Sequence, residues 1–188
     1  MDFVKKLIKK KMKKTQETAI SASSKQMPLE AEGAYQLGLK YYYGTEAPRN
    51  FEKAVRWWKL AASHDHTLAQ YNLGVVYSFD DDFERDYSEG TKWIRMAAEK
   101  GLADAQNALG AAYARGRGIA EDHTEAVHWF RMAAGQGLAA ARYNLGIMYE
   151  YGYGVEKNGK EAMKHYRKAA TAGSAEAQQE LRKKNNRP

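Results

Sequence analysis

The sequence contains no cysteine, which excludes disulfide bonds, thiolate-ligated metal sites and catalytic cysteines. No stretch approaches the roughly 20 consecutive apolar residues that a membrane-spanning helix needs. The N-terminus also lacks the continuous apolar segment and the small-residue cleavage site of a secretory signal. A cytoplasmic location is therefore expected. Because strand-type patterns are essentially absent as well, the sequence predicts an all-α protein.

The net charge of +7 is concentrated at the two ends of the chain. Residues 1–14 carry seven Lys and a single acid, Asp2, while residues 182–188 carry four basic side chains. Residues 15–181 hold 19 basic and 22 acidic side chains, so the body of the chain is mildly acidic. A uniformly basic surface of the kind that binds nucleic acid is not expected.

Four copies of one pattern follow one another at a spacing of 36 residues. Several independent columns repeat in phase, which predicts stacked units of secondary structure. The columns are Leu-Gly at 37–38, 73–74, 109–110 and 145–146, a Tyr four residues after each Leu, and Ala-Ala at 61–62, 97–98, 133–134 and 169–170.

Each copy predicts two helices. In the first helix, Gly38 and its equivalents recur although Gly weakens a helix by about 1 kcal/mol relative to Ala, which indicates that a neighbouring helix approaches closely there. The second helix is predicted to begin after an N-cap residue and to end at a residue in the left-handed conformation. The N-caps are Asn50, Asp86, Asp122 and Asn158, and the terminators are Asp65, Gly101, Gly137 and Gly173.

The predicted fold class is therefore all-α, a right-handed α/α solenoid of four 36-residue helix pairs with a C-terminal capping helix. The turn of the second repeat has Asp80, Asp81 and Asp82 where the other repeats have Gly, so we expect that turn to be rebuilt. The predicted segments are a basic amphipathic helix at 1–14, a polar linker at 15–30, repeats at 31–66, 67–102, 103–138 and 139–174, and a capping helix with a basic tail at 175–188.

Three segments resemble the Sel-one-like repeat (SLR), a relative of the tetratricopeptide repeat. They are Ala-Gln-Tyr-Asn-Leu-Gly-Val-Val-Tyr at 69–77, Glu-Ala-Val-His-Trp-Phe-Arg-Met-Ala-Ala-Gly-Gln-Gly at 125–137 and Tyr-Gly-Tyr-Gly-Val at 151–155. The resemblance covers residues 31–174. Because the family's members are mostly bacterial adaptors and regulators, it implies that the partner is another protein or a peptide.

No catalytic site, metal site or cofactor is predicted. Gly116 and Gly118 belong to a repeated turn, whereas a phosphate loop needs a strand before it. The acidic residues of the second turn lack the spaced ligands of a calcium loop. Glu125 and His128 have helical spacing but no evident third ligand, and no Ser or Thr has a neighbouring base that would make it a nucleophile. A non-enzymatic protein is expected.

The first helices are predicted to line a concave groove that binds the partner, on the face opposite Gly38 and Tyr41. Exposed aromatic side chains with a few polar groups are typical of protein-binding surfaces. Core packing explains three of these tyrosines equally well, namely Tyr35, Tyr71 and Tyr143, whereas Tyr42, Tyr43, Phe79 and Tyr151 are expected nearer the rim. The predicted partner-binding residues are Tyr35, Leu39, Tyr42, Tyr43, Tyr71, Val75, Phe79, Asn107, Arg115, Tyr143, Glu150 and Tyr151.

The N-terminal segment is a second candidate surface. Its apolar side chains fall at helical spacing among seven Lys, and a helix of this kind lies on an anionic membrane or docks on a partner. A frayed basic tail that aids solubility explains the pattern equally well. The predicted docking residues are Phe3, Leu7, Ile8, Lys5, Lys6, Lys9 and Lys10.

Three functions are compatible with these features. The first is an adaptor, scaffold or regulatory inhibitor that holds a partner protein in the groove. A special case of it is an immunity-type protein that neutralises a secreted effector toxin. The alternative is a factor that is recruited to a membrane surface through the basic N-terminal helix.

Deletion of residues 1–14 tests the membrane hypothesis. If the basic helix supplies the attraction, the intact chain binds vesicles of anionic lipid at low salt and the truncated chain does not, as measured by co-sedimentation. Failure of the intact chain to bind such vesicles would end this hypothesis.

Overall fold

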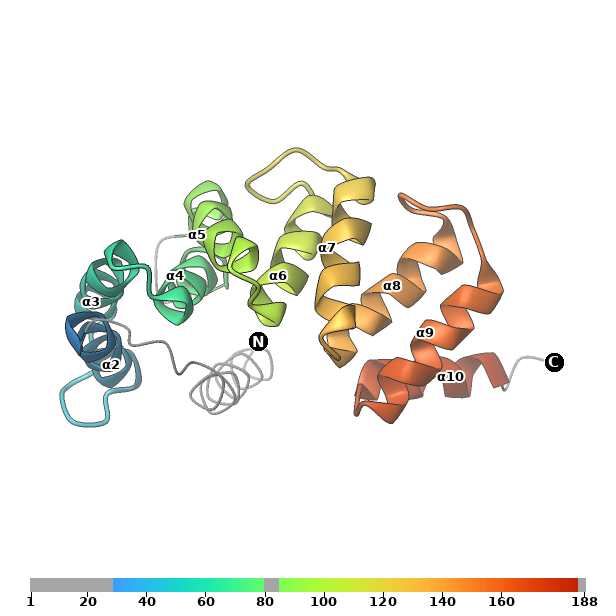
Figure 1. The fold of residues 1–188 in the computed structure, drawn as a ribbon. Helices are drawn as coiled ribbons and strands as arrows, with labels where there is room; N and C mark the ends of the chain where they lie inside the picture. Colours follow the sequence, from blue (N-terminus) through green and yellow to red (C-terminus); the bar gives the residue numbers. More distant parts are fainter. Residues whose placement is uncertain (1–28, 80–84, 186–188) are drawn as a thin grey trace. The chain divides into compact units, whose positions relative to one another are not determined.

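The computed structural model describes residues 29–79 and 85–185, and this part of the chain contains nine α-helices and no strand (Figure 1). The chain divides into two compact units, one ending at Lys100 and the other beginning at Gly101. The fold is an all-α solenoid, as predicted. The helices are α2 (Leu29–Tyr43), α3 (Phe51–Ser63), α4 (Thr67–Phe79), α5 (Tyr87–Glu99), α6 (Ala103–Tyr113), α7 (His123–Gly135), α8 (Ala139–Tyr151), α9 (Gly159–Thr171) and α10 (Ala175–Asn185).

Some predictions concern residues outside the described ranges. The basic N-terminal helix, with its docking residues Phe3, Lys5, Lys6, Leu7, Ile8, Lys9 and Lys10, is one of them, and the second-repeat turn at 80–82 is another. Helix α2 begins at Leu29, two residues before the expected start of the first repeat. Such a difference is within the usual variation in where a helix end is drawn.

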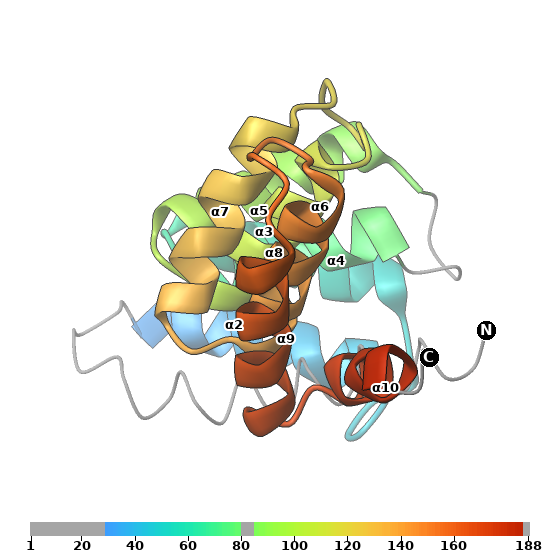
Figure 2. The same ribbon diagram turned by 90° about the vertical axis from the view of Figure 1, so that its right-hand side faces the viewer.

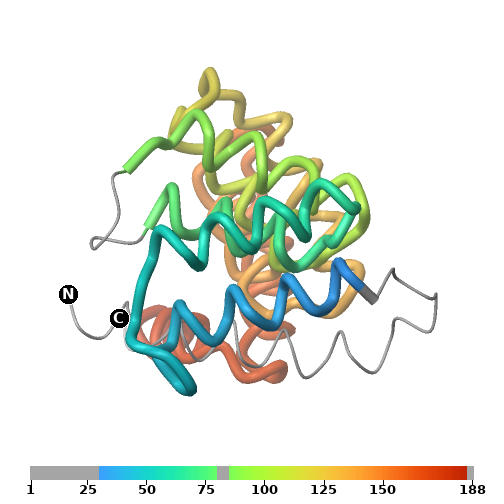
Figure 3. The backbone as a smooth tube through the Cα atoms, turned by 90° about the vertical axis from the view of Figure 1, so that its left-hand side faces the viewer, coloured from blue at the N-terminus to red at the C-terminus, as the bar shows by residue number. Residues whose placement is uncertain are grey.

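Helices that follow one another in a repeat pack as pairs. In the first unit α2 packs on α3 and α4 on α5, and α3 also contacts α4; Figure 3 shows α2 in blue beside α3. In the second unit α6 packs on α7 and α8 on α9, with α7 also contacting α8. The last helix, α10, lies against α9 (Figure 2).

The recurrent glycine of each first helix receives a large side chain from the second helix of its own repeat. A Cβ atom added at Gly110 would lie 2.8 Å from Cδ1 and Cε1 of the Phe130 ring. Real Cβ contacts are not this short, so only Gly allows the two helices to come this close. The predicted close approach is confirmed, with Gly38 facing Trp58, Gly74 facing Ile94, Gly110 facing Phe130 and Gly146 facing Tyr166.

Both predicted sets of helix-end residues are also confirmed. The side chain of Asn50 accepts a hydrogen bond from the backbone N–H of Lys53 at 2.9 Å, and the other three N-caps act in the same way. Each second helix is followed by a residue with positive φ, which favours Gly because Gly has no Cβ. The φ angles are 65° at Asp65, 90° at Gly101, 91° at Gly137 and 90° at Gly173.

None of the helices in the described ranges is both long enough and apolar enough to cross a membrane.

Substitution of Gly110 by Ala tests the close approach. We expect the free energy of unfolding to fall by about 1–3 kcal/mol because Phe130 must move, as is usual for overpacked cores. Urea denaturation would measure the change. The matched control is Gly33→Ala, since nothing lies within 4 Å of a Cβ added there. This control should stabilise the helix by up to about 1 kcal/mol. Equal stabilisation by both substitutions would contradict the packing described above.

Candidate protein-binding surface

Most of the predicted groove residues in the first unit are buried. Tyr35 and Tyr42 are 2% and 3% exposed. Tyr42 lies four residues after Gly38, so it shares the face that packs on α3, whereas the Tyr35 ring packs on His66. The expectation that Tyr42 lies near a rim is wrong for this reason. The other buried members of the predicted set are Leu39, Tyr71 and Val75.

Tyr42 is held by aromatic packing inside the first repeat. Its ring meets Phe51 edge-on at 5.5 Å between centroids and lies 5.3 Å from Trp58. Tyr43 packs edge-on against Tyr42 at 5.1 Å and is half-buried. Phe79, at the last position of α4, has 37% of its surface exposed. In this unit, therefore, Phe79 and part of Tyr43 are the predicted aromatic side chains that a partner could reach.

Tyr35 belongs to a buried junction between α2 and α4. Its ring stacks on that of His66 at 4.3 Å. His66 Nδ1 accepts a hydrogen bond from the backbone N–H of Ala69 at 3.2 Å, so Nε2 carries the proton and donates to Glu32 at 3.1 Å. Burial lowers the pKa of His66, although the Glu32 carboxylate partly opposes this shift, and Lys100 adds to the lowering. The histidine is thus held neutral as the N-cap of α4.

The predicted residues of the second unit are more accessible. Arg115 is exposed, while Asn107, Tyr143 and Glu150 are half-buried. Asn107 accepts a hydrogen bond from Asn144 at 2.9 Å, which links α6 to α8. Their role in binding a partner stays a prediction.

Glu150 already has partners inside the second unit. Its carboxylate accepts a hydrogen bond from the Tyr166 hydroxyl at 2.6 Å and pairs with the Lys184 ammonium group. Lys184 comes from α10 and lies 5.6 Å from the centroid of the Tyr166 ring. Burial, together with Glu180, Glu176 and Glu150, raises the pKa of Tyr143. The face between α8 and α10 is therefore acidic, and the chain's own Lys184 neutralises part of it.

The largest exposed aromatic surface lies where α8 ends. Tyr151 is 59% exposed and Tyr153 is 45% exposed. Their rings stack at 5.7 Å between centroids, with 21° between the ring planes. The Tyr153 ring also lies 4.9 Å from the ring of His123, the first residue of α7. We call Tyr151, Tyr153 and His123 the aromatic edge.

Two glycines position the aromatic edge. Gly152 follows α8 in the left-handed conformation with φ 77° and donates its N–H to the carbonyl of Met148 at 2.9 Å. At Gly154, with φ 65°, an added Cβ would collide with the backbone carbonyl of His123. The turn after α8 thus lies directly on the start of α7. Sequence reasoning missed Tyr153 and His123, although the Tyr-Gly-Tyr-Gly run marked the turn.

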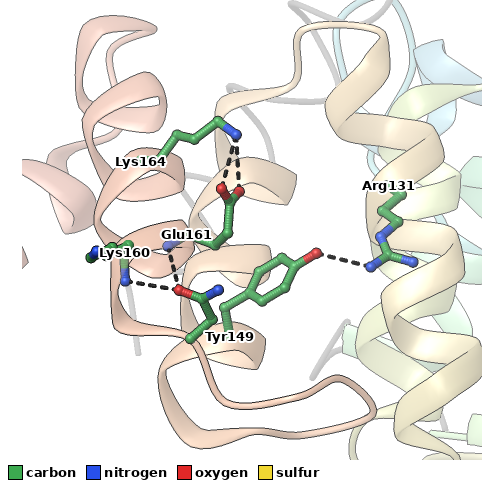
Figure 4. Close-up of polar contacts among 6 residues, drawn as sticks. Arg131, Tyr149, Lys160, Glu161 and Lys164 are labelled. Atoms are coloured by element: carbon green, nitrogen blue, oxygen red, sulfur yellow. Dashed lines mark hydrogen bonds and ion pairs between the residues drawn. The ribbon is translucent and has the colours of Figure 1, made fainter.

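Successive repeats within a unit are linked by a cation and a tyrosine. Arg131 of α7 donates a hydrogen bond to the Tyr149 hydroxyl of α8 at 2.9 Å (Figure 4). At the equivalent place in the first unit, the ammonium group of Lys59 lies 5.5 Å from the centroid of the Tyr77 ring. These contacts hold a basic side chain on the outer side of a second helix in each unit.

The helix pairs and their 36-residue spacing define a helical-repeat protein of the solenoid class. The sequence pattern of the Sel1 repeat matches residues 31–66, 67–102, 103–138 and 139–174. The chain therefore belongs to the Sel1 repeat family. Proteins of this family are generally scaffolds for protein–protein interactions.

Solved structures of similar proteins agree with this assignment. A Sel1 repeat protein from Oxalobacter formigenes is 33% identical with a TM-score of 0.77, and the match covers 79% of this chain and 43% of that one. The protective antigen c5321 of uropathogenic Escherichia coli is 32% identical with a TM-score of 0.77, covering 90% of this chain and 35% of that one. The chain thus spans less than half the length of either protein.

An immunity protein from Pseudomonas aeruginosa has the same fold at 20% identity, with a TM-score of 0.53 and coverage of 88% of this chain and 59% of that one. No protein with a curated description matches the sequence.

The buried junction at His66 predicts a dependence of stability on pH. Because burial lowers the pKa of His66 in the folded state, the unfolded chain, with a pKa of about 6.5, binds the proton first as the pH falls. Stability is then complete above about pH 6.5 and declines as the pH falls toward the lower folded pKa. Urea denaturation at a series of pH values would measure the decline.

The control for this titration is His66→Asn, which keeps an N-cap side chain but cannot take up a proton. We expect the variant to lose less stability than the wild type over the same pH range. Burial also lowers the pKa of His165, and its contribution is common to both proteins. Identical pH profiles for the two proteins would show that His66 is not held neutral.

Proposed function

We propose that this chain is a non-catalytic adaptor, scaffold or inhibitor that holds a partner protein, and that the aromatic edge is the main contact in its second unit. The observation that carries the proposal is the exposure of two stacked tyrosines, Tyr151 and Tyr153, at 59% and 45%. Large exposed aromatic side chains add little to the stability of their own fold, whereas they are enriched among the residues that dominate protein interfaces.

The geometry of the edge favours binding in a second way. Each tyrosine ring restricts the rotation of the other, and His123 supports Tyr153 from behind. Side chains that are already ordered lose less conformational entropy when a partner binds. The nearby carboxylate of Glu121 lies 3.5 Å from His123 Nε2 and is 60% exposed, so a polar group borders the aromatic edge at His123. This is the arrangement of an aromatic contact with a polar rim.

The other predicted partner-binding residues fit this proposal unequally. Arg115 and Phe79 occupy the same position in their repeats as Tyr151 does in its own, and both are exposed; Phe79 is the last residue of α4, and Arg115 follows the end of α6 by two residues. We therefore expect Arg115 and Phe79 to make additional contacts with the partner protein. Tyr35, Leu39, Tyr42, Tyr71 and Val75 are buried, and we assign them to the core.

An immunity-type role, in which the partner is a secreted toxin, is a special case of this proposal and stays a prediction. The likeness to the P. aeruginosa immunity protein supports a shared fold only, because the two sequences are 20% identical. Recruitment to a membrane through residues 1–14 concerns a segment outside the described residues.

Replacement of both tyrosines by Ala tests the aromatic edge. We expect Tyr151→Ala with Tyr153→Ala to weaken capture of the partner from a lysate of the source organism by about tenfold or more, because interface aromatics carry a large share of binding energy. Their exposure predicts that the free energy of unfolding changes by no more than about 0.5 kcal/mol. Quantitative mass spectrometry of the captured proteins would give the first value and urea denaturation the second.

The matched control is Glu156→Ala with Lys157→Ala, two exposed charged residues of the same turn. This variant should capture the same proteins as the wild type. If the tyrosine variant recovers the same proteins in the same amounts, the aromatic edge is not the binding site.

A further inference from the structure

The outer faces of the second helices carry a recurrent triplet of side chains. Its members are spaced i, i+3 and i+4, so they project from one face of the helix. The first two positions hold basic residues or His, and the third holds a large apolar residue in three of the four repeats. The triplets are Arg56, Lys59 and Leu60 in α3; Lys92, Arg95 and Met96 in α5; His128, Arg131 and Met132 in α7; and Lys164, Arg167 and Lys168 in α9.

The apolar members of the triplets are open to solvent. Leu60 is 44% exposed, Met96 is 39% exposed and Met132 is 41% exposed. The next two residues in each of these helices form the Ala-Ala pair; in α3, Ala61 and Ala62 are buried. The helix therefore turns its small residues toward the core and its larger apolar side chain toward water.

The fold itself does not require an apolar residue at this position. Helix α9 has an exposed Lys168 there, and α9 packs on α8 as α7 packs on α6. A side chain that is apolar in three repeats and leaves about two fifths of its surface exposed offers apolar surface to a partner.

Two of the basic members are held in position by the inter-repeat contacts described above. Lys59 lies over the Tyr77 ring and Arg131 donates to the Tyr149 hydroxyl, so both present their charge from a partly fixed location. A pre-positioned cation loses less entropy on meeting a carboxylate than a freely moving one does. The triplets of α3 and α7 thus combine an ordered positive charge with one adjacent apolar contact, whereas Lys92 of α5 lies 3.5 Å from Glu89 of its own helix.

We propose that the outer faces of α3, α5 and α7 are docking surfaces for an acidic amphipathic helix of a partner protein. Carboxylates of such a helix pair with the basic positions, and its apolar side chains cover Leu60, Met96 or Met132. This surface goes beyond the aromatic edge and uses different residues and different chemistry.

A protein helix fits these faces better than a membrane does. A helix that lies on a membrane buries a broad apolar stripe. In α3, Val55 and Trp58 are buried and Trp57 is half-buried, so Leu60 and part of Trp57 are the large apolar surface on its outer side. A narrow apolar contact beside several cations is suited to a single row of leucines on an acidic helix.

The test uses the full-length chain and a fluorescent synthetic helix built of Leu and Glu at heptad spacing, with fluorescence anisotropy as the readout. We expect binding that weakens as salt is added, because exposed charges are screened. The variant Leu60→Gln, Met96→Gln, Met132→Gln should weaken binding about tenfold or more, since it removes the exposed apolar member of each triplet. Gln is close to Met in length and in helix propensity, so the fold should persist.

A second variant separates charge from apolar contact. Arg56→Gln with Lys92→Gln should weaken binding and flatten its salt dependence, and neither residue belongs to the tyrosine contacts described above. The variant Tyr151→Ala with Tyr153→Ala should bind the synthetic helix as the wild type does. If this tyrosine variant loses the native partner while the triplet variants keep it and bind the synthetic helix normally, the proposed function stands and this surface is refuted.

Three further results would overturn the proposal. The first is equal binding of the synthetic helix by the wild type and the Gln triplet variant. The second is equally tight binding of polyglutamate, which has no apolar side chains. The third is tighter binding of phosphatidylserine vesicles or of a single-stranded DNA oligonucleotide that is lost in the same variants, because the surface would then serve a membrane or a nucleic acid.

Discussion

The contact between a first-helix glycine and a large side chain of the second helix determines much of the rest of the structure. Because Gly110 has no Cβ, the Phe130 ring can lie directly on the helix backbone. This contact brings the two helices of a repeat so close that a side chain one turn after the glycine is drawn into the core, as Tyr42 is beside Gly38. Surface suited to binding then remains at the helix ends and on the outer faces of the second helices.

The architecture could be predicted from the sequence because its determinants are local and repeated. An N-cap such as Asn50 and a left-handed residue such as Gly137 act within a few residues of a helix end. Because the pattern repeats every 36 residues, each of these signals occurs four times in the sequence. The exposure of the groove residues was harder to predict, since a first helix has two packed faces. Leu73 and Val75 both lie in the core, although a single helical stripe cannot include both. Treating the side opposite the leucine as open led to the incorrect placement of Tyr42.

Some residues of the candidate surfaces could not be predicted from the sequence, because they come together only in the folded chain. His123 and Tyr153 are thirty residues apart and meet only because the turn containing Gly154 folds back onto the start of α7. Met96 belongs to a recurrent column, but periodicity alone does not say whether a column faces the core or the solvent. Its neighbours Ala97 and Ala98 recur just as regularly and are fully buried.

The pairing of a cation in one repeat with a tyrosine in the next bears on how such a chain can grow. Lys59 meets Tyr77, and Arg131 meets Tyr149, across the same number of residues. A gene segment encoding 36 residues that is cut between the cation and its tyrosine therefore carries a cation for the block after it and a tyrosine for the block before it, and a segment cut elsewhere keeps the pair intact. Unequal recombination can insert or remove such a block and still join matching halves, so arrays of different length can arise without a new interface having to evolve.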